Sequence, residues 1–472
     1  MAEQDAPMYP PTPKPVKGES LDGHDAVWPV HIEVRVLPDA SVRLDTVRNA
    51  VHAFVTSSYE TLFLPSTLEG WQDVPLLSTS IHRIRACESP CPTSPLPIAQ
   101  AALQVHVYQP TEADAFEEFS SGGGEEGEEV MAAAVLELPS VLLDGLWDSL
   151  IFPDDTKQKL LDYIYATVLF SDAGVDFNVV SWNRVVLLHG PPGTGKTSLC
   201  RALAQKLSIR LSHRYPQTRL LEINSHSLFS RWFSESGKLV QRLFSSVMEL
   251  VEDEHTFVVV LIDEVESLTA ARAGAMAGTE PSDALRVVNA LLTQLDKLRH
   301  KKNVLVVSTS NLAKAIDSAF VDRADIVQYI DLPPREAIYE ILRTCLVELV
   351  QKGVISDVEV PVLEDALRYE RSAPSAASIS TATLSERERT KLVAVRLLGL
   401  SQKCRDMKMS GRALRRLPVL AHARYIGHAF SAVPSTGGAP GAGGMAIRVE
   451  VWLSAMERVL YNHADEIARF EK

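Results

Sequence analysis

The sequence predicts an α/β protein built on a parallel sheet, with a smaller α+β domain before the sheet and a helical region after it. Short apolar runs, "RVVLLH", "FVVVLI" and "NVLVVST", are separated by helical-looking stretches. Such runs are typical of parallel strands that helices cover on both faces. Before them, "HIEVRVL" (31–37) alternates like a half-buried strand, and after "QYIDLPP" (328–334) the chain looks mainly helical.

The N-terminal part of the chain contains two kinds of segment. Residues 1–25 are rich in proline and polar residues, a composition typical of disorder. Residues 26–140 are expected to form the α+β domain. A helical repeat of apolar residues at 44–54 follows the first strand, and "QVHVYQ" and "AVLELP" read as later strands.

The rest of the chain divides at the end of the predicted sheet. The parallel-sheet domain is expected over residues 144–332, and the helical domain over residues 333–472. Low-complexity stretches, including the acidic and Gly-rich residues 111–129, are interpreted as surface loops.

Charge and composition exclude several classes of protein. Against 47 Lys and Arg stand 60 Asp and Glu, a formal net charge of -13. This balance argues against a general electrostatic grip on nucleic acid or on an anionic membrane. Five scattered cysteines suit a reducing compartment, and no apolar run reaches membrane-spanning length. We therefore expect a protein of the nucleus, the cytoplasm or both, with no membrane and no direct nucleic-acid partner.

A glycine-rich segment follows the first apolar run. "HGPPGTGKTS" fits the pattern G-x-x-x-x-G-K-[ST] between a predicted strand and a predicted helix. Backbone N–H groups of such a loop and the positive end of the helix cradle nucleotide phosphates. The candidate nucleotide-binding residues are Gly190, Pro191, Pro192, Gly193, Thr194, Gly195, Lys196, Thr197 and Ser198. Lys196 is expected to reach the β- and γ-phosphates of ATP, and Thr197 to bind Mg²⁺; the alternative is a chance Gly-rich turn.

Polar residues end the other two apolar runs. Asp263 and Glu264 close the strand "FVVVLI", and Asn311 closes "NVLVVST". The carboxyl ends of parallel strands form the ligand edge of a sheet. Asp263 is therefore expected to hold Mg²⁺ with Thr197, Glu264 to polarise the attacking water, and Asn311 to help hold that water. The alternative is a set of solvated polar residues at strand ends.

These motifs, in this order, resemble those of the AAA+ ATPases over residues 144–472. "GPPGTGKT", "LIDEVESL" and "STSN" are similar to the two Walker motifs and the first sensor of that family. The resemblance implies an AAA+ P-loop NTPase fold, in which a helical lid follows a large α/β subdomain. It also implies a homo-oligomer, usually a hexameric ring, with nucleotide at the subunit interfaces.

Two arginines match positions that have known roles in the same family. "AFVDRADIVQYI" resembles the segment that supplies arginine fingers, with Arg323 at the matching position. "MSGRALRRLP" resembles the second-sensor motif, which places Arg412 toward the γ-phosphate. For both arginines, the alternative is a surface salt bridge.

Between the two Walker motifs lies a pair of large aromatic residues in a polar setting. "NSHSLFSRWFSESGKLV" (224–240) sits where AAA+ unfoldases place a substrate-gripping pore loop, which would contain Trp232, Phe233 and Ser234. The alternative is a buried aromatic pair. The family pattern has glycine at the position of Ser234.

This segment, "FVDRADI" and "SGRALRRLPVLAHA" together resemble the pachytene checkpoint ATPases. That branch remodels HORMA-domain proteins, with an adaptor, in meiosis and in the spindle checkpoint. The resemblance implies ATP-driven conversion of a HORMA-domain substrate from a closed to an open form, with residues 26–140 recruiting it. Two alternatives stay open: a DNA-acting AAA+ ATPase and a scaffold switched by nucleotide.

Overall fold

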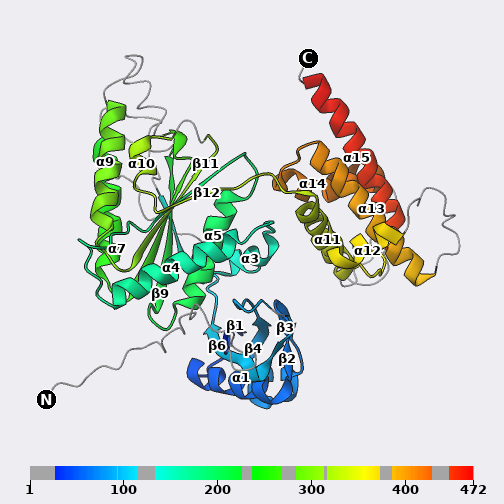
Figure 1. Cartoon of the computed structure of the whole chain (residues 1–472), viewed down its shortest axis with the longest axis horizontal. Helices are drawn as coiled ribbons and strands as arrows, with labels where there is room; N and C mark the ends of the chain where they lie inside the picture. The colour runs from blue at the N-terminus through cyan, green and yellow to red at the C-terminus, as the bar shows by residue number, and fades with distance from the viewer. Residues whose placement is uncertain are drawn as a thin grey trace, which may run out of the picture. The chain divides into compact units, whose positions relative to one another are not determined.

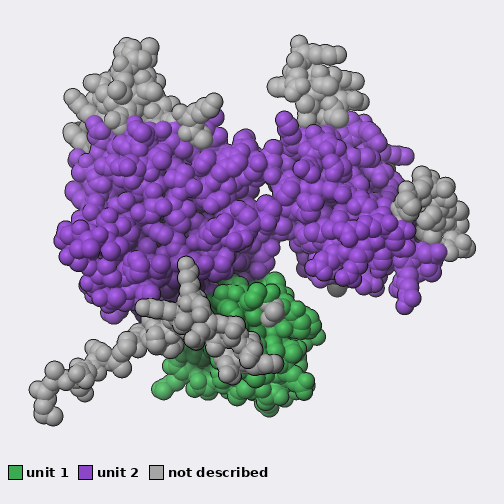
Figure 2. Space-filling model, in the orientation of Figure 1, with its two compact units in different colours: residues 1–110 green, residues 111–472 purple. Residues whose placement is uncertain are grey.

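The computed structural model describes residues 27–92, 94–113, 133–225, 236–267, 283–312, 316–372, 385–427 and 446–470. The chain divides into two compact units, residues 1–110 and 111–472 (Figure 2). No helix in these ranges is long and apolar enough to cross a membrane.

Unit 1 is a four-stranded sheet with helices on one face. Its sheet has the order β3-β4-β1-β6, in which β1 is antiparallel to β4 and parallel to β6. Alternate β1 residues Val30, Ile32 and Val34 are buried together with Val47 and Val51 of α1. The elements are β1 (Trp28–Val36), α1 (Leu44–Ser58), β2 (Thr61–Leu62), β3 (Ser66–Leu68), α2 (Pro75–Ser80), β4 (Ile81–Ala86), β5 (Leu96–Pro97) and β6 (Ala101–Tyr108).

Unit 2 begins with a six-stranded sheet, of which Figure 1 labels β9, β11 and β12. The strand order is β12-β8-β11-β10-β9-β7. The strands are β7 (Ala133–Leu138), β8 (Val185–His189), β9 (Gln217–Asn224), β10 (Thr256–Asp263), β11 (Val304–Ser310) and β12 (Ile326–Tyr329). All neighbouring strands from β12 to β9 are parallel. The predicted parallel sheet is therefore confirmed, and the apolar runs are its three central strands.

Helices cover both faces of this sheet, which explains why its strands are apolar throughout. One core joins a sheet face to α7 (Ser236–Glu252) and α9 (Asp283–Leu298). The other core joins the opposite face to α4 (Thr156–Asp172) and α5 (Lys196–Arg210). Short helices α3 (Leu146–Ser149) and α10 (Ser318–Val321) complete this subdomain.

The position of β7 corrects the predicted domain boundary. The predicted N-terminal domain of residues 26–140 includes "AVLELP", but β7 pairs antiparallel with β9 in the large sheet. The division between the units lies after residue 110 instead. A short apolar strand carries no signal of which sheet it joins, so its place along the chain suggests the wrong one.

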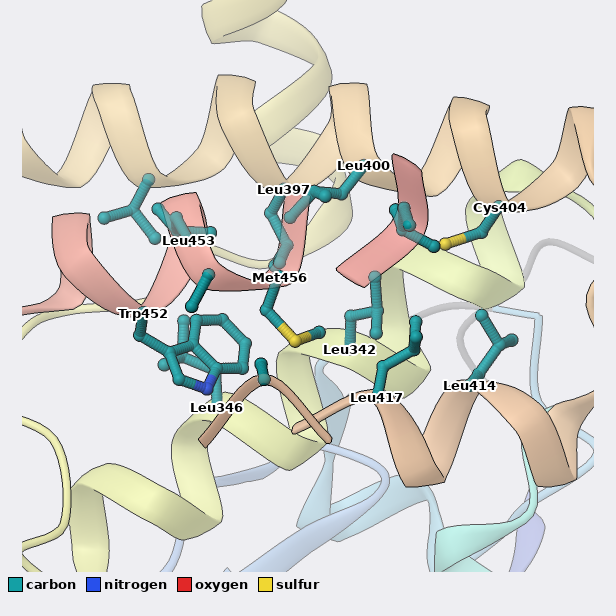
Figure 3. Packing of buried hydrophobic residues seen from close by; sticks show 14 of the residues in the cluster. Leu342, Leu346, Leu397, Leu400, Cys404, Leu414, Leu417, Trp452, Leu453 and Met456 are labelled. Atoms are coloured by element: carbon teal, nitrogen blue, oxygen red, sulfur yellow. The ribbon is translucent and has the colours of Figure 1, made fainter. Parts of the chain in front are cut away.

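Among the described residues after β12 the chain is mainly helical, as expected. The helices are α11 (Arg335–Gln351), α12 (Leu363–Ser372), α13 (Glu386–Asp406), α14 (Gly411–Ala421) and α15 (Val449–Phe470). They enclose an apolar core of their own, in which Leu342, Leu397, Leu414 and Trp452 come from four different helices (Figure 3). We call this part of unit 2 the lid.

Candidate functional site

The loop after β8 requires glycine at its first position. Gly190 has φ +145°, and a Cβ there would lie 2.1 Å from the carbonyl oxygen of Ile330. Its N–H donates to the carbonyl of Ser310, at 3.2 Å, and the N–H of Ile330 donates to the carbonyl of His189, at 2.8 Å. The start of the loop is thus held between β11 and the end of β12.

The middle of the loop lies directly against the lid. Gly193 has φ +76°, and a Cβ there would lie 2.7 Å from Ser410 Oγ and 3.4 Å from Arg412 Cβ. The backbone N–H of Arg412 donates to the carbonyl of Gly193, at 3.1 Å. Ser410 caps α14 by accepting from the N–H of Ala413. The first turn of α14 therefore brings Arg412, a predicted site residue, to the loop.

Lys196 is buried at the first position of α5. Its ammonium donates to the carbonyls of Gly190, at 2.8 Å, and Pro191, at 2.7 Å. Burial lowers the pKa of Lys196, and the positive charge of Arg412 adds to this effect, whereas the carboxylates of Glu266 and Asp263 oppose it. The Lys196 ammonium therefore interacts with the loop, with carboxylates at and after the end of β10, and with the lid.

An oxygen-rich cluster lies beside the loop. Thr197 Oγ1 donates to Asp263 Oδ1 at 2.9 Å, which joins the first turn of α5 to the end of β10. Thr309 of β11 also donates to Asp263 Oδ1. A hydroxyl and a carboxylate at this spacing are the oxygen donors that Mg²⁺ prefers. The donor set fits this cation, with Thr197 and Asp263 able to hold it.

Glu264 and Asn311 follow neighbouring strands. Glu264 has φ +58°, which is rare for a residue with a side chain, and its N–H donates to Thr309 Oγ1 at 3.3 Å. The backbone N–H of Asn311 donates to Glu266 Oε1 at 3.0 Å. Parallel pairing of β10 with β11 thus places both predicted residues at the same sheet edge.

Two predicted features lie apart from this cluster. The contacts that the structure gives to the Arg323 guanidinium are with Asp296 and with the carbonyl of Ala319, and none of them is with the loop at 190–198. Trp232, Phe233 and Ser234 lie outside the described residues.

Three family models match the chain: the TRIP13 N-terminal domain at residues 25–113, the AAA ATPase domain at 186–332, and the TRIP13-like AAA+ ATPase lid C-terminal domain at 334–435. The pachytene checkpoint protein 2 homolog of Danio rerio is 44% identical over 404 residues, which cover 84% of this chain and 88% of that protein. The chain belongs to the pachytene checkpoint protein 2 family of AAA+ ATPases.

Two further members of this family are also similar to the chain. The Homo sapiens pachytene checkpoint protein 2 homolog is 42% identical over 405 residues, which cover 84% of this chain and 88% of that protein. The solved structure of C. elegans PCH-2 is 31% identical, has a TM-score of 0.67, and covers 92% of this chain and 99% of that one. Membership of the pachytene checkpoint protein 2 family confirms the AAA+ fold and makes the chain an ATP-binding ATPase.

Sequence reasoning missed several polar residues around this candidate site. Thr309 and Glu266 bind backbone or side-chain groups of the predicted residues, and Ser410 positions α14 beside Gly193. Each stands within three residues of a recognised position, in "STSN", "DEVES" and "MSGR". Their side chains act on neighbouring strands or on the loop, so proximity in the sequence gives no sign of their partners.

Proposed function

We propose that the protein is an ATP-driven remodelling enzyme that converts HORMA-domain proteins from a closed to an open form, with an adaptor. The observation that carries this proposal is that TRIP13 family models match both the N-terminal domain at residues 25–113 and the lid at residues 334–435, on either side of an AAA ATPase domain. The proposed setting is meiotic chromosome and spindle-checkpoint control, in the nucleus, the cytoplasm or both.

Nucleotide binding is proposed at the loop between β8 and α5. Backbone N–H groups of residues 190–195 would face the phosphates, together with the positive end of α5. Phosphate oxygens would replace the carbonyls of Gly190 and Pro191 as acceptors for Lys196. Thr197 and Asp263 would hold Mg²⁺, which when bound offsets the negative charge of the phosphoryl oxygens.

Hydrolysis is proposed to begin with a water polarised by Glu264. The carboxylate accepts a proton from the water while the oxygen attacks the γ-phosphorus, and the bond to the β–γ bridging oxygen breaks to release ADP. Asn311 would help to orient the water, and Arg412 would bind the γ-phosphate from the lid. Arg323 would complete the site of the neighbouring subunit in a homo-oligomer, proposed to be a hexamer.

Substrate handling is proposed for the segment that contains Trp232, Phe233 and Ser234. Large aromatic side chains can hold many kinds of residue through apolar contact. A Trp232→Ala protein should therefore hydrolyse ATP at close to the normal rate but fail to convert a HORMA-domain substrate. Normal conversion by this variant would show that the pore assignment is wrong.

The decisive experiment uses Glu264→Gln as a substrate trap. The variant should bind ATP without hydrolysing it, so HORMA-domain proteins should co-purify from cell extract in ATP and be lost in ADP. The matched control carries Lys196→Ala as well, which should abolish nucleotide binding and retention. Recovery of nucleic acid or of unrelated proteins, without any HORMA-domain protein, would contradict the proposal.

Two other results would favour the alternative functions. Undiminished function of Glu264→Gln would favour a scaffold switched by nucleotide, because a scaffold does not need hydrolysis. Tight, salt-sensitive binding to duplex DNA would favour a DNA-acting ATPase.

A further inference from the structure

We propose that Thr309 is a positioning residue for ATP hydrolysis. Its hydroxyl helps to hold the backbone of Glu264 at the end of β10, and thereby the direction of the Glu264 carboxylate. The inference rests on the proposed role of Glu264 in polarising water. It adds to that role a residue on the neighbouring strand, which does not itself touch the reacting atoms.

Three contacts join Thr309 to three consecutive residues. Its hydroxyl donates to Asp263 Oδ1 and accepts from the N–H of Glu264, at 3.3 Å. Its carbonyl accepts from the N–H of Val265, at 3.0 Å. The Thr309 side chain is buried, with 2% of its surface exposed. One residue of β11 therefore contacts three consecutive residues at the end of β10 and in the turn that follows it.

That turn has an unfavourable backbone conformation. Glu264 has φ +58°, in the left-handed region where a side chain crowds the backbone. Such a conformation persists only where the surrounding structure holds it, and it is frequent at functional sites. The N–H that Thr309 accepts belongs to Glu264 itself, so this hydrogen bond acts at the strained residue. Loss of the bond would remove a contact that holds the Glu264 backbone in this conformation, and so would weaken the control over the direction of its carboxylate.

The chemistry of the contact requires a hydroxyl. Thr309 Oγ1 is a donor to one group and an acceptor for another at the same time, which a hydroxyl does well and a thiol only weakly. Valine has nearly the same shape and does neither. Serine keeps the hydroxyl and loses only the methyl group. Thr309→Val and Thr309→Ser therefore separate hydrogen bonding from packing.

The adjacent residue on the same strand supplies a matched control. Ser308 is also buried, but its hydroxyl donates to the carbonyl of Val186 on β8, at 3.0 Å. Ser308→Ala removes one buried hydroxyl from β11 without touching Asp263 or Glu264. A general loss of stability in β11 should affect this variant as much as Thr309→Val.

The test measures turnover and nucleotide affinity separately in the assembled full-length protein. Thr309→Val should lower kcat about tenfold or more, with the Kd for a non-hydrolysable ATP analogue changed less than about threefold. Thr309→Ser and Ser308→Ala should keep kcat within about threefold of the parent protein. Thermal unfolding of each variant reports its stability.

Several outcomes would overturn the proposal. Normal kcat in Thr309→Val would do so, as would equal losses in Thr309→Val and Thr309→Ser, or in Thr309→Val and Ser308→Ala. A rise in Kd with unchanged kcat would assign Thr309 to binding instead. If Thr309→Val does not fold, Thr309→Cys, with its weak donor, must show the same selective fall in kcat.

Glu264→Gln, measured in parallel, distinguishes failure of the proposed function from failure of this inference. Normal turnover by Glu264→Gln would remove the role of Glu264, and with it that of Thr309. An inactive Glu264→Gln beside a fully active Thr309→Val would overturn the inference about Thr309 alone.

Discussion

Arg323 and Asp296 form a bidentate ion pair within one chain. Arg323 Nε lies 2.8 Å from Asp296 Oδ1, and Nη2 lies 2.9 Å from Oδ2. The pKa of Arg323 is raised, mainly by its hydrogen bonds to Asp296. The guanidinium that the family resemblance assigns to a neighbour's active site is therefore held and oriented by the subunit that carries it.

The first prediction concerns this pair. Arg323→Lys keeps the charge but cannot form the paired contacts of a guanidinium. We expect kcat to fall about a hundredfold or more, with nucleotide affinity nearly unchanged, because an arginine finger acts on the transition state. Asp296→Asn should lower kcat less, since Arg323 keeps its charge and its hydrogen bond to the carbonyl of Ala319. Steady-state ATPase assays and nucleotide titration would measure both effects.

Mixed assemblies test whether Arg323 acts across an interface. Arg323→Ala and Glu264→Gln proteins should each be inactive alone. Co-assembled, an Arg323→Ala subunit keeps its own Glu264 and receives Arg323 from a Glu264→Gln neighbour. Recovery of activity is expected, and its absence in verified mixed assemblies would contradict action in trans.

A second prediction follows from the contact between the nucleotide loop and the lid. Gly193→Ala would bring a Cβ to within 2.7 Å of Ser410 Oγ at a residue with φ +76°. We expect ATP affinity to fall about tenfold or more, because α14 must move away from the loop. Gly353→Ala is the matched control, with φ +70° and no atom within 4 Å of its Cβ. It should cost about 1 kcal/mol of stability from backbone strain alone and leave the Kd for ATP unchanged.

A third prediction concerns the lid core. Leu397 is fully buried at the centre of this core (Figure 3), so Leu397→Ala should lower the free energy of unfolding by about 2–5 kcal/mol. Val419, on α14 with 70% of its surface exposed, gives the comparison. Val419→Ala should change stability by less than about 0.5 kcal/mol. Denaturant titration would measure both, and equal effects would show that Leu397 is not part of a closely packed core.

A fourth prediction uses the pH dependence of stability. Burial, and then the charge of Lys196, lower the pKa of His189 below its usual value. Between the lowered pKa and about 6.5 the unfolded chain binds more protons than the folded one, so this contribution to stability is lost as the pH falls through that window. His189→Gln should therefore show a smaller drop in Tm between about pH 7.5 and 5.5 than the parent protein. An equal drop would mean that His189 does not contribute.

Local sequence patterns are sufficient for the parts of the fold with strong periodicity. The apolar strands and the glycine-rich loop require particular residue types, so the places of Gly190, Lys196 and Asp263 follow from the sequence alone. Pairing between distant segments is not encoded so plainly. For that reason the predicted boundary at residue 140 leaves β7 in the wrong domain, and the contacts of Thr309 with Asp263 and of Gly193 with Arg412 have no signature in the sequence.

The close fit of Gly190 against Ile330 has a mechanical consequence. Ile330 follows β12 directly, and α11, the first helix of the lid, begins only five residues later at Arg335. The segment that leads into the lid therefore packs against the first residue of the nucleotide loop. With 17 residues, α11 is a lever about 25 Å long, so a turn of about 10° at its base would carry its far end through about 4 Å. Small changes at a phosphate can in this way become displacements on the scale of a side chain.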